Sequence, residues 1–353
     1  MLKSLRRRVS GTTIAMWIIG IILLVVVIYG SVRTIMLDKY TGRDWLDLFV
    51  YGISQGSIYA LIALGYTMVY GILRMINFAH GDVFMAGAFI GYFVASYFGQ
   101  TGFLESNLVL SLIIITLVAA ATAAAIAVML ERIAYRPLRR APRLVPLITA
   151  IGASFFLEYA FLGLFGSGIK GYPDIAALKG RVVIFGVEIL KTQVVVIVAA
   201  IVMLIALWFF VQRTKMGKAI QAVSEDKDAA ALMGINVDRS IMITFLVGGA
   251  LAGAAGVLYA LLFRQVYFFM GFFPGLKAFT AAVLGGIGNI AGAMVGGLFL
   301  GIAESLFPNL VLDGLGIPAP YQLKDALAFL LLVLVLIFRP TGILGERLAT
   351  KKA

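Results

Sequence analysis

Four polar residues stand close together between two long apolar runs of the sequence: Arg74, Asn77, His80 and Asp82. Side chains of these types can line a pathway or form a gate. Polar groups among apolar helices are costly to bury and usually face a cavity or a partner. We therefore take these residues as candidates for a pathway or a gate. The structural alternative is a solvated turn in which His80 bonds locally.

A second candidate group lies around a glycine-rich break, Gly285-Gly286-Ile287-Gly288-Asn289, inside the apolar stretch 276–308. Helices broken inside a membrane often present their ends to a substrate. The pathway candidates here are Lys277, Thr280, Gly286, Gly288 and Asn289. Two structural alternatives stand beside this interpretation: Lys277 can snorkel to the outer surface, and glycines at small-xxx-small spacing can serve close helix packing.

The elements that must position these residues are membrane helices. Hydrophobic residues make up 62% of the 353-residue chain and charged residues 13%, against about 45–50% and about 25% in a soluble domain. Many apolar runs reach the roughly 20 residues that cross a bilayer. The sequence predicts an all-α, polytopic helical membrane protein with about 8–10 transmembrane segments. The predicted segments are 14–36, 46–73, 77–98, 108–130, 144–165, 192–212, 241–263, 276–288, 290–308 and 322–338.

Several chemistries are excluded by residue content. The chain has no cysteine and one histidine, which excludes disulfides, thiolate metal sites and multi-histidine metal sites. The glycines at 286–291 lie in an apolar stretch and not between a strand and a helix, and Gly217-Lys218 lacks the surrounding residues of a phosphate loop. We expect no catalytic residue, no metal, no cofactor and no ATP site in this chain. The net charge of +12 lies at the ends of apolar runs, so we expect no nucleic acid partner.

Basic residues predict the orientation. Lysines and arginines gather in 1–13, 131–143, 213–240 and 339–353, and loops rich in them stay in the cytoplasm. Both termini and Arg74 are then cytoplasmic, which requires an even number of crossings. The stretch 276–308 must turn around once, as two short helices or as a re-entrant pair broken at its glycines.

Two further segments have local signatures. The run 14–36 is longer than a signal-peptide core and no cleavage site closes it, so it is predicted to be an uncleaved first transmembrane helix. The outer loop 166–191 contains a strand-like stretch, Arg181–Phe185, followed by Gly186. This pattern predicts a small hairpin on the outer face.

The basic segment 213–240 contains a candidate docking helix. Ser224 is a suitable N-cap, Glu225-Asp226 would lie in the first turn, and Gly234 suits the position that ends a helix. The resulting helix of two to three turns is too short to be stable alone in water. It needs a partner surface, which is its own protein, lipid headgroups or a cytoplasmic subunit.

The same segment resembles a known loop. Asp228-Ala229-Ala230-x-x-x-Gly234 is similar to the Glu-Ala-Ala-x-x-x-Gly loop of ABC importer permeases, whose short coupling helix sits in a groove on the ATPase subunit. Asp228 replaces the glutamate, and the later Ile-x-Leu-Pro of that loop is absent. The resemblance implies coupling to an ATPase through Ser224, Glu225, Asp226, Asp228, Ala229, Ala230 and Gly234.

Three stretches narrow the family. Residues 71–82, 222–236 and 275–293 together resemble the bacterial and archaeal branched-chain amino acid ABC permeases, and Asn77–Gly81 resembles their H-type subunit. The resemblance covers about residues 45–340, so the helix at 14–36 is an addition to it. It implies one transmembrane permease domain over 1–353, with the coupling helix in 213–240.

The resemblance also implies partners and a place in the cell. Two related permeases, two ATPase subunits that bind ATP and magnesium, and an external binding protein would import leucine, isoleucine or valine across the plasma (inner) membrane. Two alternatives stay open. The cargo of an ABC permease can be urea, short amides or other amino acids, or the chain can be a secondary carrier without an ATPase, with Glu158 and Glu304 as its ionisable groups.

Overall fold

The computed structural model describes residues 11–345 except Arg140, Arg143, Phe185, Ala319 and Pro340, and it describes side chains from Met16 onward. Some basic residues of the orientation argument lie outside this part of the chain: Lys3, Arg6, Arg7, Arg8, Arg140, Arg143, Arg347, Lys351 and Lys352.

Helices form almost all the regular structure of the described residues, and nine of them are long and apolar enough to cross a membrane. The prediction of an all-α, polytopic membrane protein is confirmed. The principal helices are α1 (Gly11–Met36), α2 (Gly42–Leu73), α3 (His80–Gln100), α5 (Leu108–Leu130), α6 (Leu144–Phe165), α7 (Lys191–Arg213), α10 (Val237–Phe263), α11 (Phe272–Gly285), α12 (Ile290–Phe307) and α13 (Lys324–Phe338). Short helices are α4 (Phe103–Ser106), α8 (Lys215–Glu225) and α9 (Lys227–Leu232).

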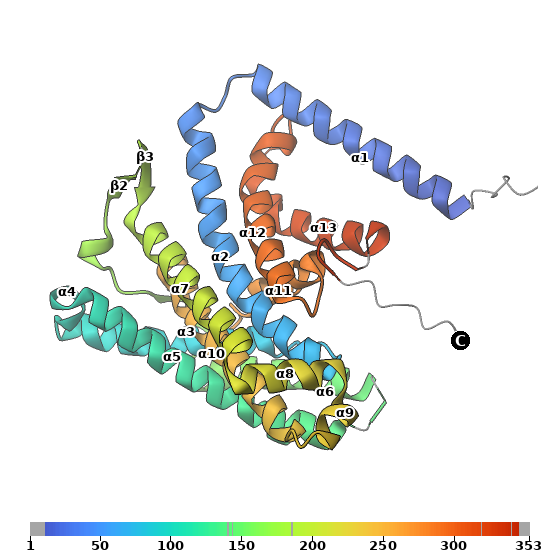
Figure 1. Cartoon of the computed structure of the whole chain (residues 1–353). Helices are drawn as coiled ribbons and strands as arrows, with labels where there is room; N and C mark the ends of the chain where they lie inside the picture. The colour runs from blue at the N-terminus through green and yellow to red at the C-terminus, as the bar shows by residue number, and fades with distance from the viewer. Residues whose placement is uncertain are drawn as a thin grey trace, which may run out of the picture.

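The bundle has two distinct ends (Figure 1). At one end, β2 (Arg181–Ile184) pairs with β3 (Val187–Leu190) in an antiparallel hairpin, as predicted. We call this the hairpin end. The 23-residue helix α7 leads from the hairpin to α8 and α9, which mark the opposite end, the α8–α9 end.

Contacts gather three of the predicted cytoplasmic segments at the α8–α9 end. The Arg74 guanidinium donates to the carbonyl of Ser224 at 3.1 Å, which joins the end of α2 to α8. Arg139 pairs with the buried Glu131 and with Asp238 at the start of α10. Residues that are far apart in sequence but share a basic character therefore lie at the same end of the bundle.

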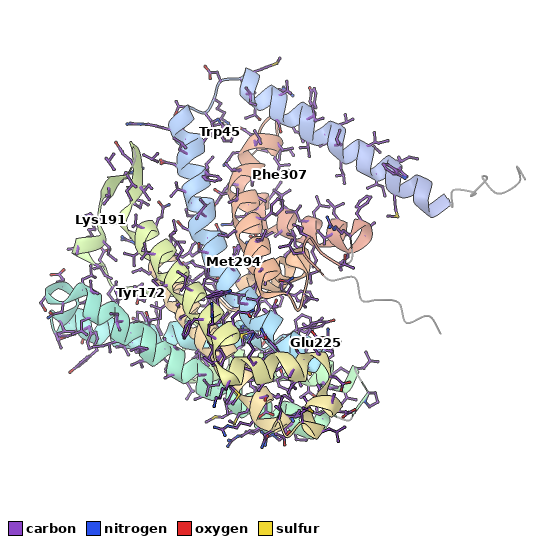
Figure 2. The ribbon with its side chains drawn as sticks, in the orientation of Figure 1. Trp45, Tyr172, Lys191, Glu225, Met294 and Phe307 are labelled. Atoms are coloured by element: carbon purple, nitrogen blue, oxygen red, sulfur yellow. The ribbon has the colours of Figure 1, made fainter. Side chains whose placement is uncertain are left out.

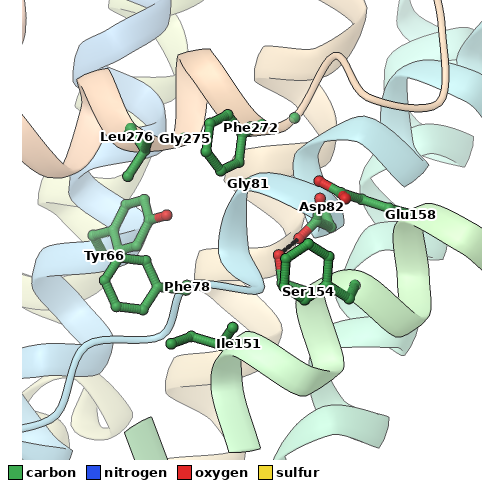
Figure 3. A pocket seen from close by; sticks show the side chains of 12 residues that line it. Tyr66, Phe78, Gly81, Asp82, Ile151, Ser154, Glu158, Phe272, Gly275 and Leu276 are labelled. Carbon is green, nitrogen blue, oxygen red and sulfur yellow. Dashed lines mark hydrogen bonds between the residues drawn. The ribbon is translucent and has the colours of Figure 1, made fainter. Parts of the chain in front are cut away.

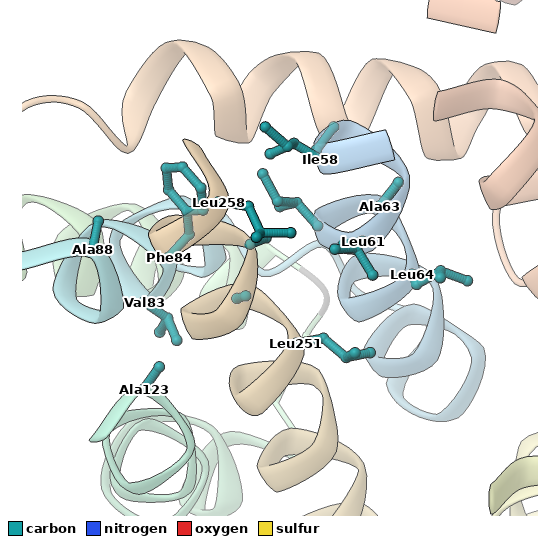
Figure 4. Packing of buried hydrophobic residues seen from close by; sticks show 14 of the residues in the cluster. Ile58, Leu61, Ala63, Leu64, Val83, Phe84, Ala88, Ala123, Leu251 and Leu258 are labelled. Atoms are coloured by element: carbon teal, nitrogen blue, oxygen red, sulfur yellow. The ribbon is translucent and has the colours of Figure 1, made fainter. Parts of the chain in front are cut away.

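Small residues allow the central helices to approach closely. A Cβ added at Gly301 would collide with the backbone of Gly56, and one added at Gly87 would collide with Gly253. Apolar side chains gain little by meeting each other in lipid, so backbone contact at small residues supplies much of the packing. Larger side chains fill the remaining core, among them Ile58, Leu61, Leu64, Phe84, Leu251 and Leu258 (Figure 4).

The predicted glycine break is confirmed, and it separates helices of unequal length. Helix α11 has 14 residues and spans about 21 Å at 1.5 Å per residue, short of the roughly 30 Å hydrocarbon core. Before it, β4 (Gln265–Val266) pairs with β1 (Lys170–Gly171). After it, α12 has 18 residues. The stretch is thus a short helix followed by a longer one.

The backbone at this break is satisfied by the C-terminal segment. The N–H groups of Ile343 and Leu344 donate to the carbonyls of Leu284 and Gly285 at 2.8 and 2.9 Å. Gly286 has a φ of +109°, which only glycine adopts without strain. Non-helical backbone inside a membrane protein needs such internal partners because lipid supplies none.

Helix α1 stands apart from the rest of the bundle, and its side chains point mostly away from other described residues (Figure 2). It is attached near its C-terminal end, where Gly30 lies against Val311 and Lys39 pairs with Asp313 at 2.8 Å. An apolar helix so exposed in water would be unfavourable, and lipid or another membrane protein is the environment that suits it.

Candidate functional site

A cavity of about 230 Å³ lies among α2, α3, α6 and the start of α11 (Figure 3). Two carboxylates, Asp82 of α3 and Glu158 of α6, line it together with Tyr66 of α2 and Ser154 of α6. The remaining lining residues are Phe78, Gly81, Ile151, Phe155, Gly271, Phe272, Gly275 and Leu276. The cavity therefore combines apolar walls with two acidic groups, a composition typical of a ligand site.

Asp82 is the most distinctive residue of the cavity. Its exposed fraction is 1%. The Ser154 hydroxyl donates to its Oδ2, whereas its Oδ1 has no partner among the described residues. Figure 3 shows the Glu158 carboxyl group beside that of Asp82. An unsatisfied buried carboxylate oxygen is costly, so this arrangement calls for a donor from a ligand or from solvent.

The other three residues of the predicted polar cluster make internal contacts. Arg74 bonds α8 at the Ser224 carbonyl, and the Tyr135 hydroxyl donates to Asn77 Oδ1 at 2.6 Å. The His80 ring packs edge-on against Tyr66, with centroids 4.7 Å apart. Of the predicted cluster, the structure brings Asp82 into the lining of the cavity.

Lys277 belongs to a separate buried cluster. Its Nζ lies 3.0 Å from Glu304 of α12 and 2.6 Å from Asp325 of α13, and it donates to the Tyr59 hydroxyl at 3.3 Å. The alternative in which Lys277 snorkels to the outer surface is wrong, since its side chain is 4% exposed. The acidic groups on α12 and α13 hold the ammonium inside the bundle. Gln55 also donates to Glu304, at 2.8 Å.

The remaining pathway candidates near the break have local partners. Thr280 donates to the carbonyl of Leu276 at 2.9 Å within α11. Asn289 caps α12 by accepting from the Gly292 N–H, and its amide donates to the Leu344 carbonyl at 2.9 Å. Gly286 packs against Gly345, and Gly288 shares the positive φ of the turn. A pathway role for these residues stays a prediction.

The docking helix begins later than predicted. Ser224 does not cap it, and Glu225 is not in its first turn, because both residues end α8. Thr214 caps α8. One side of this helix is buried and consists of Gly217, Ile220 and Val223. That burial extends α8 through Glu225, and Asp226 then caps α9 by accepting from the N–H groups of Asp228 and Ala229.

Helix α9 has a small buried side and a large exposed one. Ala230 is buried, whereas Leu232 and Met233 are 89% and 82% exposed. Gly234 follows in the left-handed region with a φ of +82°, as its predicted helix-ending role requires. Burial lowers the pKa of Lys227 at the start of α9, and the charges of Arg139 and Arg74 lower it further.

Sequence reasoning missed Ser154 and Asp325 as partners of the predicted residues. A signal for Ser154 was present, because Ser154 and Glu158 are four residues apart in an apolar run and so share one helix face. No signal marked Asp325, which stands at the end of its apolar segment, where a charged residue is common.

Comparisons with known proteins identify relatives over most of the chain. A family model described as "Branched-chain amino acid transport system / permease component" matches residues 48–336. The high-affinity branched-chain amino acid transport system permease protein BraD of Pseudomonas aeruginosa is 43% identical over 311 residues, which cover 86% of this chain and 96% of BraD. LivH of Escherichia coli, described in the same words, is 42% identical over 307 residues with the same coverage.

Among solved structures, PsaBC from Streptococcus pneumoniae in complex with Fab aligns over 86% of this chain and 94% of its own, with 14% identity and a TM-score of 0.42.

The match to the family model, at residues 48–336, includes the cavity, the Lys277 cluster and α9, and it begins after α1. The chain belongs to the permease components of branched-chain amino acid transport systems, a family of ABC importer permeases.

Proposed function

We propose that this chain is a permease subunit of an ATP-driven importer for leucine, isoleucine and valine, and that it forms half of the translocation pathway. The similarity to BraD and LivH, both branched-chain amino acid transport permeases, supports this cargo. The other half of the pathway belongs to a second, paired permease. The complex lies in the plasma (inner) membrane with both termini of this chain in the cytoplasm. The basic residues at the α8–α9 end support this orientation, which requires the nine long helices of the described residues and the short α11 together to make an even number of crossings.

The observation that carries the proposal is the exposed apolar tip of α9. Leu232 and Met233 stand almost free of their own chain at an end of the bundle where arginine and lysine side chains gather. A helix of six residues is not stable alone, and the two large apolar side chains exposed outside the apolar spans support docking of a partner at this position. The occupant is a cytoplasmic ATPase subunit.

The connections of α9 suit it to transmit motion. Ala230 anchors it, α8 links it to α7, Arg74 links α8 to α2, and α10 begins four residues after Met233. A shift of α9 is therefore passed to three long helices at once. Packed helices move as rigid bodies, so ATP binding elsewhere in the complex would rock the bundle as a unit.

The partners follow from this scheme. Two ATPase subunits bind ATP and magnesium, so that this chain holds no cofactor of its own. An external binding protein delivers the amino acid at the hairpin end. The whole chain, 1–353, acts as one transmembrane permease domain, with α1 as an added helix and 213–240 as the coupling segment.

Coupled uptake tests the proposal. The complete transporter is reconstituted in lipid vesicles with its binding protein outside and ATP inside, and uptake of radiolabelled leucine, isoleucine, valine, urea and acetamide is measured with ATP hydrolysis. We expect uptake of the three branched amino acids that requires ATP. Uptake of urea or acetamide in their place would contradict the cargo, and uptake without ATP would contradict the ABC mechanism.

A further inference from the structure

On the basis of the proposed function, we propose that the cavity between α3, α6 and α11 is a binding subsite for an α-amino acid in transit. In this subsite the carboxylates of Asp82 and Glu158 hold the ammonium group of the ligand. The apolar wall holds its side chain, and the start of α11 faces its carboxylate. The ligand class is a small zwitterion with a branched apolar side chain.

The two acidic groups of the cavity favour a cationic group of the ligand. Its lining includes two carboxyl groups and no lysine or arginine. Asp82 is almost completely buried, with Oδ1 unpartnered among the described residues. Two adjacent acidic groups in a low-dielectric site need hydrogen-bond donors and a positive charge. An ammonium group supplies three donors and a positive charge. The Lys277 cluster differs in this respect, because Glu304 and Asp325 are already paired with the ammonium group of Lys277.

The walls of the cavity suit the rest of the ligand. Phe78, Ile151, Phe155 and Leu276 present hydrocarbon to the interior, which favours a side chain without polar atoms. Helix α11, 14 residues long, starts at the same cavity with Phe272. The N-terminal end of a helix carries a partial positive charge that favours an anion. The acidic groups and the helix end thus offer opposite charges to the two ends of a zwitterion.

The position of the cavity also assigns a face to the pathway. Two of its lining residues, Phe155 of α6 and Phe272 of α11, are about half-exposed. Carboxylates that opened onto lipid hydrocarbon would be strongly unfavourable. The α6–α11 face therefore borders the translocation pathway, with the second permease opposite.

Cysteine labelling tests the subsite directly, because the chain has no cysteine of its own. The Ile151→Cys variant of the assembled transporter, without ATP, is treated with a small thiol reagent, and labelling of this chain is followed on a gel. Three ligands are compared: leucine, leucinol, which keeps the ammonium but lacks the carboxylate, and 4-methylpentanoate, which lacks the ammonium. The control is Ile148→Cys, which lies on α6 outside the lining.

We expect leucine to protect Cys at position 151, leucinol to protect it at higher concentration, and 4-methylpentanoate not to protect it. Asp82→Asn should require about tenfold or more leucine for the same protection, since a charged hydrogen bond is lost. Glu158→Gln provides the same test should Asp82→Asn fail to assemble. Protection by 4-methylpentanoate equal to that by leucine, or full protection in either variant, would overturn the subsite. Coupled uptake by the unmodified transporter reports separately on the proposed function.

Discussion

At the scale of single residues, the described chain contains two kinds of buried acid. Glu304 faces the ammonium of Lys277, so its charge is balanced within the bundle. Asp82 and Glu158 face a cavity with no cation in its lining. Removal of one partner from a buried ion pair destabilises a protein, whereas buried acidic groups beside a cavity without a basic partner are candidates for a ligand site. The two groups should therefore respond differently to substitution.

Removal of the cation from the balanced group should destabilise the protein. Lys277→Met leaves Glu304 buried without its cation, and the loss of one partner of a buried pair costs about 3–5 kcal/mol. We expect a clear fall in the thermal midpoint of the purified protein, measured by fluorescence-detected size exclusion after heating. The double variant Lys277→Met/Glu304→Gln should recover part of the loss. A single variant as stable as the unmodified protein would contradict this role.

The sequence could identify these residues but not their partners. Lys277 and Asp82 are conspicuous because each is a charge beside or within an apolar run. That Lys277 meets Glu304 and Asp325, 27 and 48 residues away, depends on how α11, α12 and α13 pack. No local pattern contains that information, and the interpretation of Lys277 as a snorkelling residue failed for this reason.

At the scale of helices, hydropathy predicted the long elements because a membrane span is set by length and apolar content. The boundary between α8 and α9 was harder. Ser224 and Asp226 are both good N-cap residues, and burial of Ile220 and Val223 against the bundle decided between them. Tertiary contact thus settled a choice that propensity left open.

Close packing between α2 and α12 should be intolerant of added volume. A side chain at Gly301 would meet the backbone of Gly56, so Gly301→Leu must separate the two helices or strain them. Overpacking of this kind costs about 1–3 kcal/mol. The matched control is Gly152→Leu on α6, where a Cβ has open space. We expect a lower thermal midpoint for the first variant only, and equal midpoints would contradict the packing argument.

The turn after α9 should control coupling. Gly234→Val places a β-branched residue at a φ of +82°, where the strain is roughly 1–2 kcal/mol. Nothing crowds this position, so the effect is confined to the end of α9. We expect ATP hydrolysis to continue while leucine uptake per ATP falls.

The conservative variant Gly234→Asn is the control, because asparagine tolerates the left-handed region. It should retain most of the coupling. Normal coupled uptake by Gly234→Val, with the variant present in the membrane at the level of the unmodified protein, would contradict the assignment of α9 as the coupling element.

At the scale of the whole molecule, the bundle is polarised between its two ends. The hairpin end carries the paired strands β2 and β3 (Figure 1), and the α8–α9 end carries Arg74, Arg139 and the exposed tip of α9. Orientation and partners are properties of the assembled complex, which a single sequence reports only through its charges and its family. We infer that the α8–α9 end docks an ATPase subunit.

Co-purification tests this claim most directly. The tagged chain is extracted in mild detergent, and its stoichiometric partners are identified by mass spectrometry for the unmodified protein and for Leu232→Asp/Met233→Asp. Both side chains are exposed, so their replacement should leave the fold intact. The control is Val182→Asp/Val183→Asp on the opposite, hairpin end. We predict two ATPase subunits and a second permease with the unmodified chain and the control, and loss of the ATPase from the α9 variant. A chain that purifies alone, or an α9 variant that keeps its ATPase, would contradict the account.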